Sequence, residues 1–263
     1  MQQRSGAREL GLAVASLAAL SRFVEGAPLP AVTALIVLVA ISGSARLRGE
    51  RNPERWRLDR LILPGLAAFA AVGIARLVDP VPWLAGVFAG SWLVVAWVAS
   101  IEADPPRALS DGSHARPVAA RLGALGLAFG AFAAVGGLIP GILPGGGRQP
   151  EIATSLLALA LLVVAGSLAG ARIAAVRPHT AGRVVAAFCQ YAIVLAPTGI
   201  AVWVMGLPRL FGPALLLLAT YLATSLRESD EPLGSNVRRL EEVAVLVLAG
   251  LAVVALGLLT RQW

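Results

Sequence analysis

Two pairs of carboxylates are the residues whose type and spacing could do chemistry. Glu102 and Asp104 lie two positions apart, and Glu228 and Asp230 repeat that spacing. Such a pair could share a Mg²⁺ ion that holds a phosphate or a pyrophosphate. The carboxylates could instead form ion pairs with arginines of the same half of the chain, namely Arg46, Arg51, Arg172 and Arg177. Because acids and arginines recur together in both halves, the sequence favours ion pairs.

A second candidate group lies within an apolar run of the second half. It comprises Gln190, Tyr191, Thr198 and Gly199, with Gly73 as the counterpart of Gly199 in the first half. Gln190 needs a polar partner in lipid, so we expect it to face other helices. Two roles remain open for the group: bonding between helices, or lining a site for a solute or a lipid.

Gly73 and Gly199 also admit two structural interpretations. With Gly86 and Gly212 they bracket a predicted helical hairpin, where glycine permits positive φ and close backbone approach. Alternatively, they interrupt their helices and expose backbone groups to a ligand. The hairpin interpretation is favoured, although Pro197 removes one helical hydrogen bond just before Gly199.

Several kinds of site have no candidate residues in this sequence. The two histidines, His114 and His179, fall in predicted loops, and the single cysteine is Cys189. Neither a Ser/His/Asp set nor an HExxH motif occurs, and the predicted spans have no central acid or lysine. We therefore expect no catalytic residues, no metal and no cofactor.

An internal repeat organises these residues. Residues 73–86 recur as residues 199–212, with seven of fourteen positions identical at an offset of 126. The same offset relates Arg46 to Arg172 and Glu102 to Glu228, while an offset of 115 relates residues 10–20 to residues 125–135. Such self-similarity predicts a tandem duplication.

The elements that carry the candidate residues are predicted membrane spans. A span needs about 20 apolar residues. Nine segments approach that length: 10–24, 30–44, 61–78, 82–101, 122–139, 152–170, 184–206, 211–226 and 240–260. They predict an all-α polytopic membrane protein with a four-helix repeat at 1–112, a second, parallel four-helix repeat at 113–233 and a ninth helix at 234–263.

Composition supports the membrane assignment. The chain is 57% apolar and 14% charged, unlike soluble domains. Its net charge of +7 comes from arginine alone, because lysine is absent. Since these arginines flank the apolar segments without a nucleic-acid-binding motif, we expect the lipid bilayer as a partner and no nucleic acid.

Arginine placement predicts the orientation. The N-terminal tail and the even-numbered loops carry 17 of the 22 arginines. Because positive loops stay in the cytoplasm, we expect a cytoplasmic N-terminus, an outside C-terminus and a bacterial-type plasma membrane.

Nine spans arranged as four, four and one, with an inside N-terminus, resemble the UbiA-type prenyltransferases. In that family, aspartate-rich motifs lie in the loops after spans two and six. Here the first of those loops contains Asn52, Glu54 and Asp59 without the family's spacing, and the second contains no acid. The resemblance is one of architecture and covers no motif.

Three functions are compatible with this pattern. The leading hypothesis is a non-enzymatic accessory or scaffold subunit of a membrane complex, which docks other membrane subunits or associates with itself. A second is a carrier or flippase for a lipid-like or weakly polar solute. A third is a metal-dependent enzyme that acts on lipid phosphates at the cytoplasmic rim.

Overall fold

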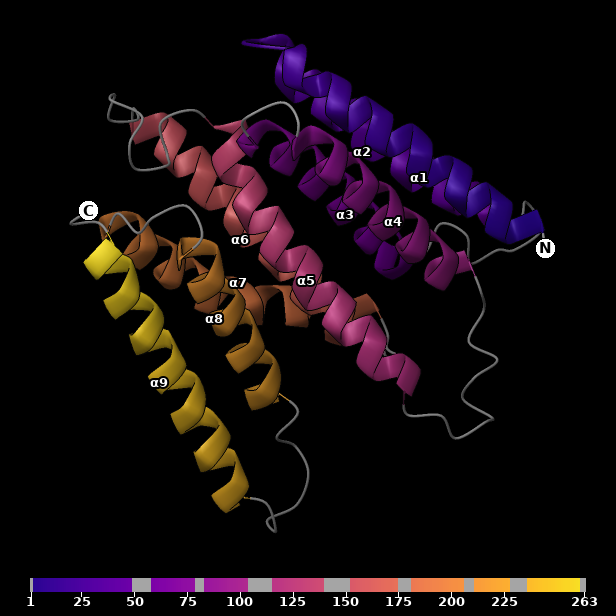
Figure 1. Ribbon diagram of the computed structural model, residues 1–263. Helices are drawn as coiled ribbons and strands as arrows, with labels where there is room; N and C mark the ends of the chain where they lie inside the picture. Colours follow the sequence, from indigo (N-terminus) through magenta and orange to yellow (C-terminus); the bar gives the residue numbers. More distant parts are fainter. Residues whose placement is uncertain are drawn as a thin grey trace.

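The protein is all-helical wherever its structure is described. The computed structural model describes residues 2–48, 58–78, 83–103, 115–139, 152–174, 181–205, 211–227 and 236–260. These residues contain no strand (Figure 1). They form one 3₁₀ turn, η1 (Ser21–Phe23), and nine α-helices: α1 (Gln2–Leu20), α2 (Pro28–Leu47), α3 (Leu58–Leu77), α4 (Leu84–Ala103), α5 (Ala115–Leu138), α6 (Ile152–Ala174), α7 (Ala181–Met205), α8 (Phe211–Arg227) and α9 (Asn236–Thr260).

Five of the described helices contain a segment that is long and apolar enough to cross a membrane. Those segments are Pro28–Leu47, Arg60–Leu77, Leu84–Glu102, Ile152–Arg172 and Val185–Met205. Helices α5, α8 and α9 contain shorter apolar stretches. The structure therefore supports a helical bundle with several apolar helices, whereas the number of spans remains a prediction.

Several helices begin before the apolar segment that predicts them. Helix α1 begins at Gln2 rather than Leu10, α5 at Ala115 rather than Leu122, and α9 at Asn236 rather than Leu240. The added turns contain arginine, alanine and glutamate, which favour helix. Helical hydrogen bonding thus continues past the point where apolar periodicity stops.

Proline and glycine mark the connections in the first half. Pro28 occupies the first turn of α2, where the missing N–H costs no helical hydrogen bond. Gly26, with φ of 70°, precedes that turn and is the only described residue with positive φ. Pro64 and Pro197 instead lie inside α3 and α7, where each removes one backbone hydrogen bond.

The first four helices and the next four share a pattern of neighbours. Helix α1 contacts α2 and α4, and α2 contacts α3 and α4; correspondingly, α5 contacts α6 and α8, and α6 contacts α7 and α8. Helix α3 joins the two halves by packing against α5 and α6. Helix α9 packs against α8 at the edge opposite α1 and α2 (Figure 1).

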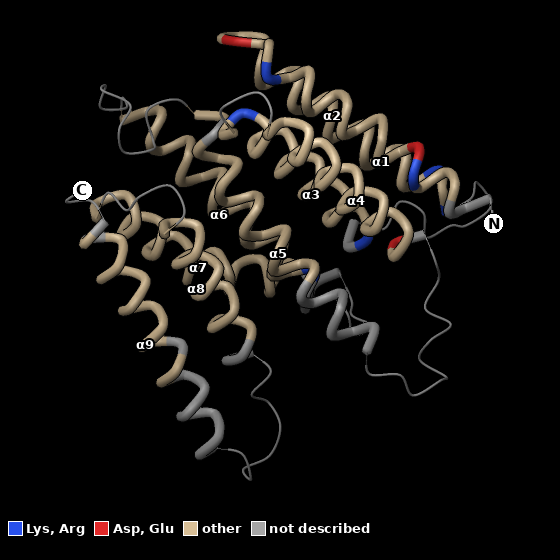
Figure 2. Tube along the Cα trace, in the orientation of Figure 1, with Lys and Arg blue, Asp and Glu red and all other residues tan. Residues whose placement is uncertain are grey.

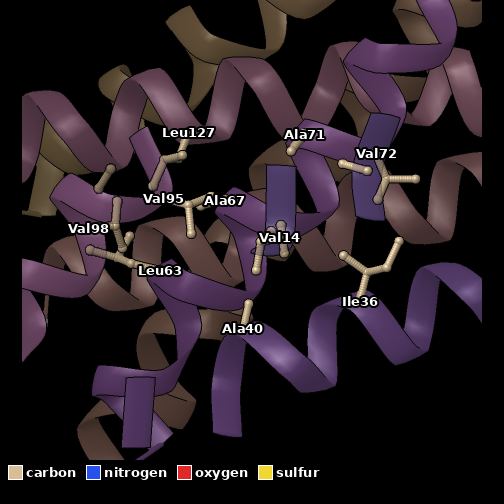
Figure 3. Packing of buried hydrophobic residues seen from close by; sticks show 13 residues of the cluster. Val14, Ile36, Ala40, Leu63, Ala67, Ala71, Val72, Val95, Val98 and Leu127 are labelled. Atoms are coloured by element: carbon tan, nitrogen blue, oxygen red, sulfur yellow. The ribbon is translucent and has the colours of Figure 1, made fainter. Parts of the chain in front are cut away.

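Two large apolar clusters, with a smaller third one at Val135, Ile139 and Ala158, hold the described helices together. The first unites α1 to α5 and is shown in Figure 3, where Ile36 points toward Val72 and Val95 lies beside Ala67. The second unites α5 to α8 around Phe132 with one residue of α3. Many members of both clusters are alanines, so the helices approach closely and rely on van der Waals contact.

Candidate functional site

A buried ion cluster joins the ends of α2, α4 and α6. Glu102, in the last turn of α4, lies between Arg48 and Arg172, and we call these three residues the rim cluster. The Arg172 Nε and Nη2 atoms donate to Glu102 Oε1 at 3.1 and 2.6 Å. Arg48 Nη2 lies 3.8 Å from Glu102 Oε2. The carboxylate therefore bridges one arginine of its own half and one of the other half.

Arg48 also binds backbone carbonyls of two further helix ends. Its Nε donates to the Glu102 carbonyl at 3.0 Å, and its Nη2 donates to the Arg60 carbonyl at 2.6 Å. Glu102 lies near the C-terminus of α4, where the orphan carbonyls attract cations. Arg48 thus ties the end of α2 to the beginning of α3 and the end of α4.

The rim cluster is shielded from solvent. The side chains of Arg48, Glu102 and Arg172 are 1%, 3% and 14% exposed. When one partner of a buried ion pair is removed, the other charge stays buried without compensation, and the free energy of unfolding falls by about 3–5 kcal/mol. Elsewhere along the described helices, charged residues lie mainly near the ends, while the middles are apolar (Figure 2).

The pairing differs from the sequence-based expectation in two respects. Arg172 was expected to meet acids of the second half, yet it binds Glu102 of the first half. Arg46 is exposed, and Arg48 occupies the position beside Glu102. Sequence repetition could not reveal Arg48, because its counterpart is Ala174. The remaining predicted partners, Arg51, Asp104, Arg177, Glu228 and Asp230, lie outside the described residues.

The local charges at the rim cluster favour ion pairing over metal binding. A divalent cation against Glu102 would also meet the positive charges of Arg48 and Arg172. Among the described residues, no group of three or more His, Cys, Asp and Glu side chains is suited to a metal ion. Glu102 therefore acts here as a connector between helices.

The predicted lining residues of α7 point in different directions. Tyr191 is buried, with its hydroxyl 2.9 Å from Thr224 Oγ1 of α8. Thr198 Oγ1 donates to the Val194 carbonyl of its own helix at 2.8 Å. Gln190, which was expected to face the bundle, is exposed, because the positions of Ala187 and Tyr191 form the inward face of α7. These side chains do not surround one space.

Gly73 and Gly199 lie inside helices rather than in turns, and they differ in their neighbours. A Cβ on Gly73 would lie 2.2 Å from the Ala134 Cα atom, so α3 and α5 meet there backbone to backbone. A Cβ on Gly199 would meet only the tip of Leu159, at 2.6 Å. Close helix approach, rather than positive φ or ligand lining, explains Gly73.

An apolar groove runs between α7, α8 and α9. Its volume is about 410 Å³, and its walls include Thr198, Ala201, Leu218, Leu222, Val247 and Gly250. Thr198 is the predicted lining residue that borders this groove. The residues that line the groove belong to α7, α8 and α9, and none of them belongs to α3 or α5.

A reciprocal arginine lock closes the other end of the first half, and sequence reasoning did not anticipate it. Arg76 Nη1 donates to the carbonyls of Ser21 and Val24, each at 2.8 Å. Arg22 Nη1 in turn binds the Val78 carbonyl just beyond α3. Each guanidinium thereby satisfies carbonyls at the end of a neighbouring helical element. In the sequence, the only feature that could have indicated this contact is that Arg22 and Arg76 each lie near the end of a predicted helix.

The comparisons with known proteins add no relative: no protein-family model, no curated protein and no solved structure matches this chain.

Proposed function

We propose that this chain is a non-enzymatic integral membrane protein that serves as an accessory or scaffold subunit of a membrane complex. The observation that carries the proposal is the rim cluster, where the chemically capable side chains Arg48, Glu102 and Arg172 bind one another and hold helix ends together. Because these three side chains bind one another, they stabilise the packing of the helices and are not free to bind a substrate.

The outer surface supports the same proposal. Leu93 on α4, Leu156 on α6 and Ile193 on α7 are at least 61% exposed, although each is a large apolar side chain. Such faces suit contact with lipid or with helices of other subunits.

The proposal includes nine spans, two parallel four-helix repeats, a cytoplasmic N-terminus and an outside C-terminus. The recurring neighbours of α1–α4 and α5–α8 support the repeats.

Native mass spectrometry of the protein released gently from its own membrane tests this function. A scaffold is expected to carry a stoichiometric protein partner, which chemical crosslinking in the membrane should also capture. A lone monomer in both measurements would overturn the proposal. A lone monomer that retains one specific lipid or isoprenoid would favour the second candidate.

The second candidate, a carrier or flippase for a lipid-like or weakly polar solute, is favoured by the groove between α7, α8 and α9. Gly250 borders that groove, and a Cβ there would lie 3.7 Å from the nearest heavy atom. Gly250→Leu should therefore fill the groove and expel a retained lipid. Gly90→Leu on α4 is the control, because Gly90 is exposed and a Cβ at that position meets nothing within 4 Å. Equal lipid retention in both variants would argue against a binding groove.

The metal-dependent enzyme is the third and weakest candidate. It requires Asp104, Glu228 and Asp230, which lie outside the described residues, to converge with Glu102 on one pocket. The engagement of Glu102 with two arginines weighs against it.

A further inference from the structure

Two prolines inside helices each leave one backbone carbonyl without its helical donor. Proline has no N–H, so Pro64 cannot bind the carbonyl of Arg60 in α3, and Pro197 cannot bind the carbonyl of Ile193 in α7. An unpaired carbonyl inside a bilayer is costly, because no water is present there to bind it. We therefore asked which group binds each freed carbonyl.

The rim cluster supplies the missing donor at Pro64. Arg48 Nη2 donates to the Arg60 carbonyl at 2.6 Å, so a guanidinium takes the place of the N–H that proline lacks. Pro64 lies near the beginning of α3, and charged residues lie mainly near the helix ends (Figure 2). A charged donor is therefore within reach of this carbonyl.

No described side chain takes that role at Pro197. This proline lies inside the apolar segment Val185–Met205, and among the described residues no side chain donates to the Ile193 carbonyl. The hydroxyl of the next residue, Thr198, donates at 2.8 Å to the Val194 carbonyl, which also has the Thr198 amide as its helical donor. The Ile193 carbonyl thus remains available as an acceptor.

The freed acceptor lies beside the groove between α7, α8 and α9. A helical carbonyl points along the axis toward the residue one turn later, so the carbonyl of Ile193 points at the ring of Pro197. Pro197 lines the groove. Both residues are exposed, Ile193 by 72%. Because a proline ring pushes such a carbonyl aside, the oxygen becomes accessible from the groove.

The groove presents hydrogen-bond acceptors but neither donors nor charges. Thr198 has the only polar side chain among the lining residues, and its hydroxyl hydrogen is engaged with Val194. The remaining lining residues are apolar or glycine, around a volume of about 410 Å³. A phosphate or carboxylate group would find no cation among these residues, and its charge would stay uncompensated. A neutral molecule with an apolar body and one hydroxyl matches this lining.

We propose that the groove binds a neutral lipid alcohol, whose chain fills the space between α7 and α9 and whose hydroxyl donates to the Ile193 carbonyl. This inference rests on the second candidate function, for which it names the class of solute, and it is independent of the scaffold function. The hydroxyl should raise the affinity about fivefold, which corresponds to about 1 kcal/mol, the usual net contribution of one hydrogen bond.

Photolabelling with two matched probes tests the site. The probes are oleyl alcohol and its methyl ether, each with a diazirine in the chain, so the ether alone lacks a donor. The full chain is labelled in lipid nanodiscs, and mass spectrometry of its peptides locates the label. We expect the alcohol to label the groove residues Leu215, Leu218 and Val247 about fivefold more strongly than the ether does. Equal labelling by both probes, or label outside the groove, would overturn the proposal.

Pro197→Ala restores the N–H that the Ile193 carbonyl lacks and leaves the other lining residues in place. In this variant we expect both probes to label the groove equally. Pro64→Ala is the matched control, because it also restores a helical N–H but in α3, and it should keep the preference for the alcohol. If Pro64→Ala does not fold, Thr198→Val serves instead, since it leaves the Ile193 carbonyl free. A preference that survives Pro197→Ala contradicts the proposal.

Gly250→Leu separates the inference from the function on which it rests. The added side chain fills the groove, so neither probe should label it in this variant. Equal labelling of the unmodified groove by both probes, abolished by Gly250→Leu, refutes selection of a hydroxyl and leaves a lipid-binding groove standing. Absence of label in the unmodified groove with either probe refutes both.

Discussion

Helices α3 and α7 carry related sequences but occupy different environments. Both contain Gly-Ile-Ala, at residues 73–75 and 199–201. Of the apolar segment of α3, 67% of the residues are buried, against 22% for that of α7. Helix α3 contacts α1, α2, α4, α5 and α6, whereas the main partners of α7 are α6 and α8.

The difference shows that one sequence pattern can serve two purposes. In α3, Gly73 allows a backbone contact between the halves, and the surrounding side chains are enclosed. In α7, Gly199 faces only the flexible tip of Leu159, and the neighbouring Ile200 is open. Four substitutions, each paired with a control, can break or sharpen this comparison.

The largest effect is expected at the rim cluster. Glu102→Ala leaves Arg48 buried without its carboxylate, so we expect a loss of about 3–5 kcal/mol in the free energy of unfolding. Arg46→Ala, at the exposed counterpart of Arg172, should change that energy by less than about 0.5 kcal/mol. Denaturant titration in mixed micelles measures both. Similar losses would show that the buried bridge between the halves contributes no special stability.

The second effect compares the paired glycines directly. Gly73→Ala forces α3 away from Ala134, because a backbone cannot yield as a side chain does, and should cost about 2–3 kcal/mol. Gly199→Ala requires only a rotamer change of Leu159 and should cost less than about 1 kcal/mol. The same titration reports both values. A reversed order would contradict the assignment of α3 as the central helix.

The third effect concerns the arginine lock, which occurs in the first half alone. The counterparts of Arg22 and Arg76 are Gly137 and Val202. Arg76→Leu loses hydrogen bonds from a charged donor to two carbonyls and should destabilise the protein by about 2 kcal/mol. Val202→Leu is the matched control and should be nearly neutral. If hydrogen exchange at Ser21 and Val24 does not accelerate in Arg76→Leu, the lock does not hold that turn.

The smallest effect is expected at Tyr191, whose counterpart in α3 is Gly65. Tyr191→Phe removes the hydrogen bond to Thr224 and should cost about 1 kcal/mol. Tyr221→Phe, at a 42% exposed position, provides the control and should cost less. Thermal unfolding in lipid nanodiscs can resolve the two. Equal melting temperatures of the two variants would show that the hydrogen bond between Tyr191 and Thr224 makes no net contribution to stability.

Much of the candidate site was predictable as a list of residues, but its contacts were not. Glu102 and Arg172 could be selected because they recur with acids and arginines at a fixed offset. Arg48 could not be selected in this way, because a search for repeated residues does not find a residue that occurs in only one half. Gln190 was expected to face inward because it is polar, yet the turn of α7 places Tyr191 there instead.

The sequence by itself determined the helices and their number among the described residues, because long apolar stretches without strand-type alternation satisfy their backbone polar groups within a single helix. It also determined that charges lie near helix ends. Only the tertiary structure decided which helix is central, which two arginines meet Glu102 and which of two equivalent glycines supports a backbone contact. Burial and charge pairing depend on neighbours from distant parts of the chain, and two segments with related sequences receive different neighbours.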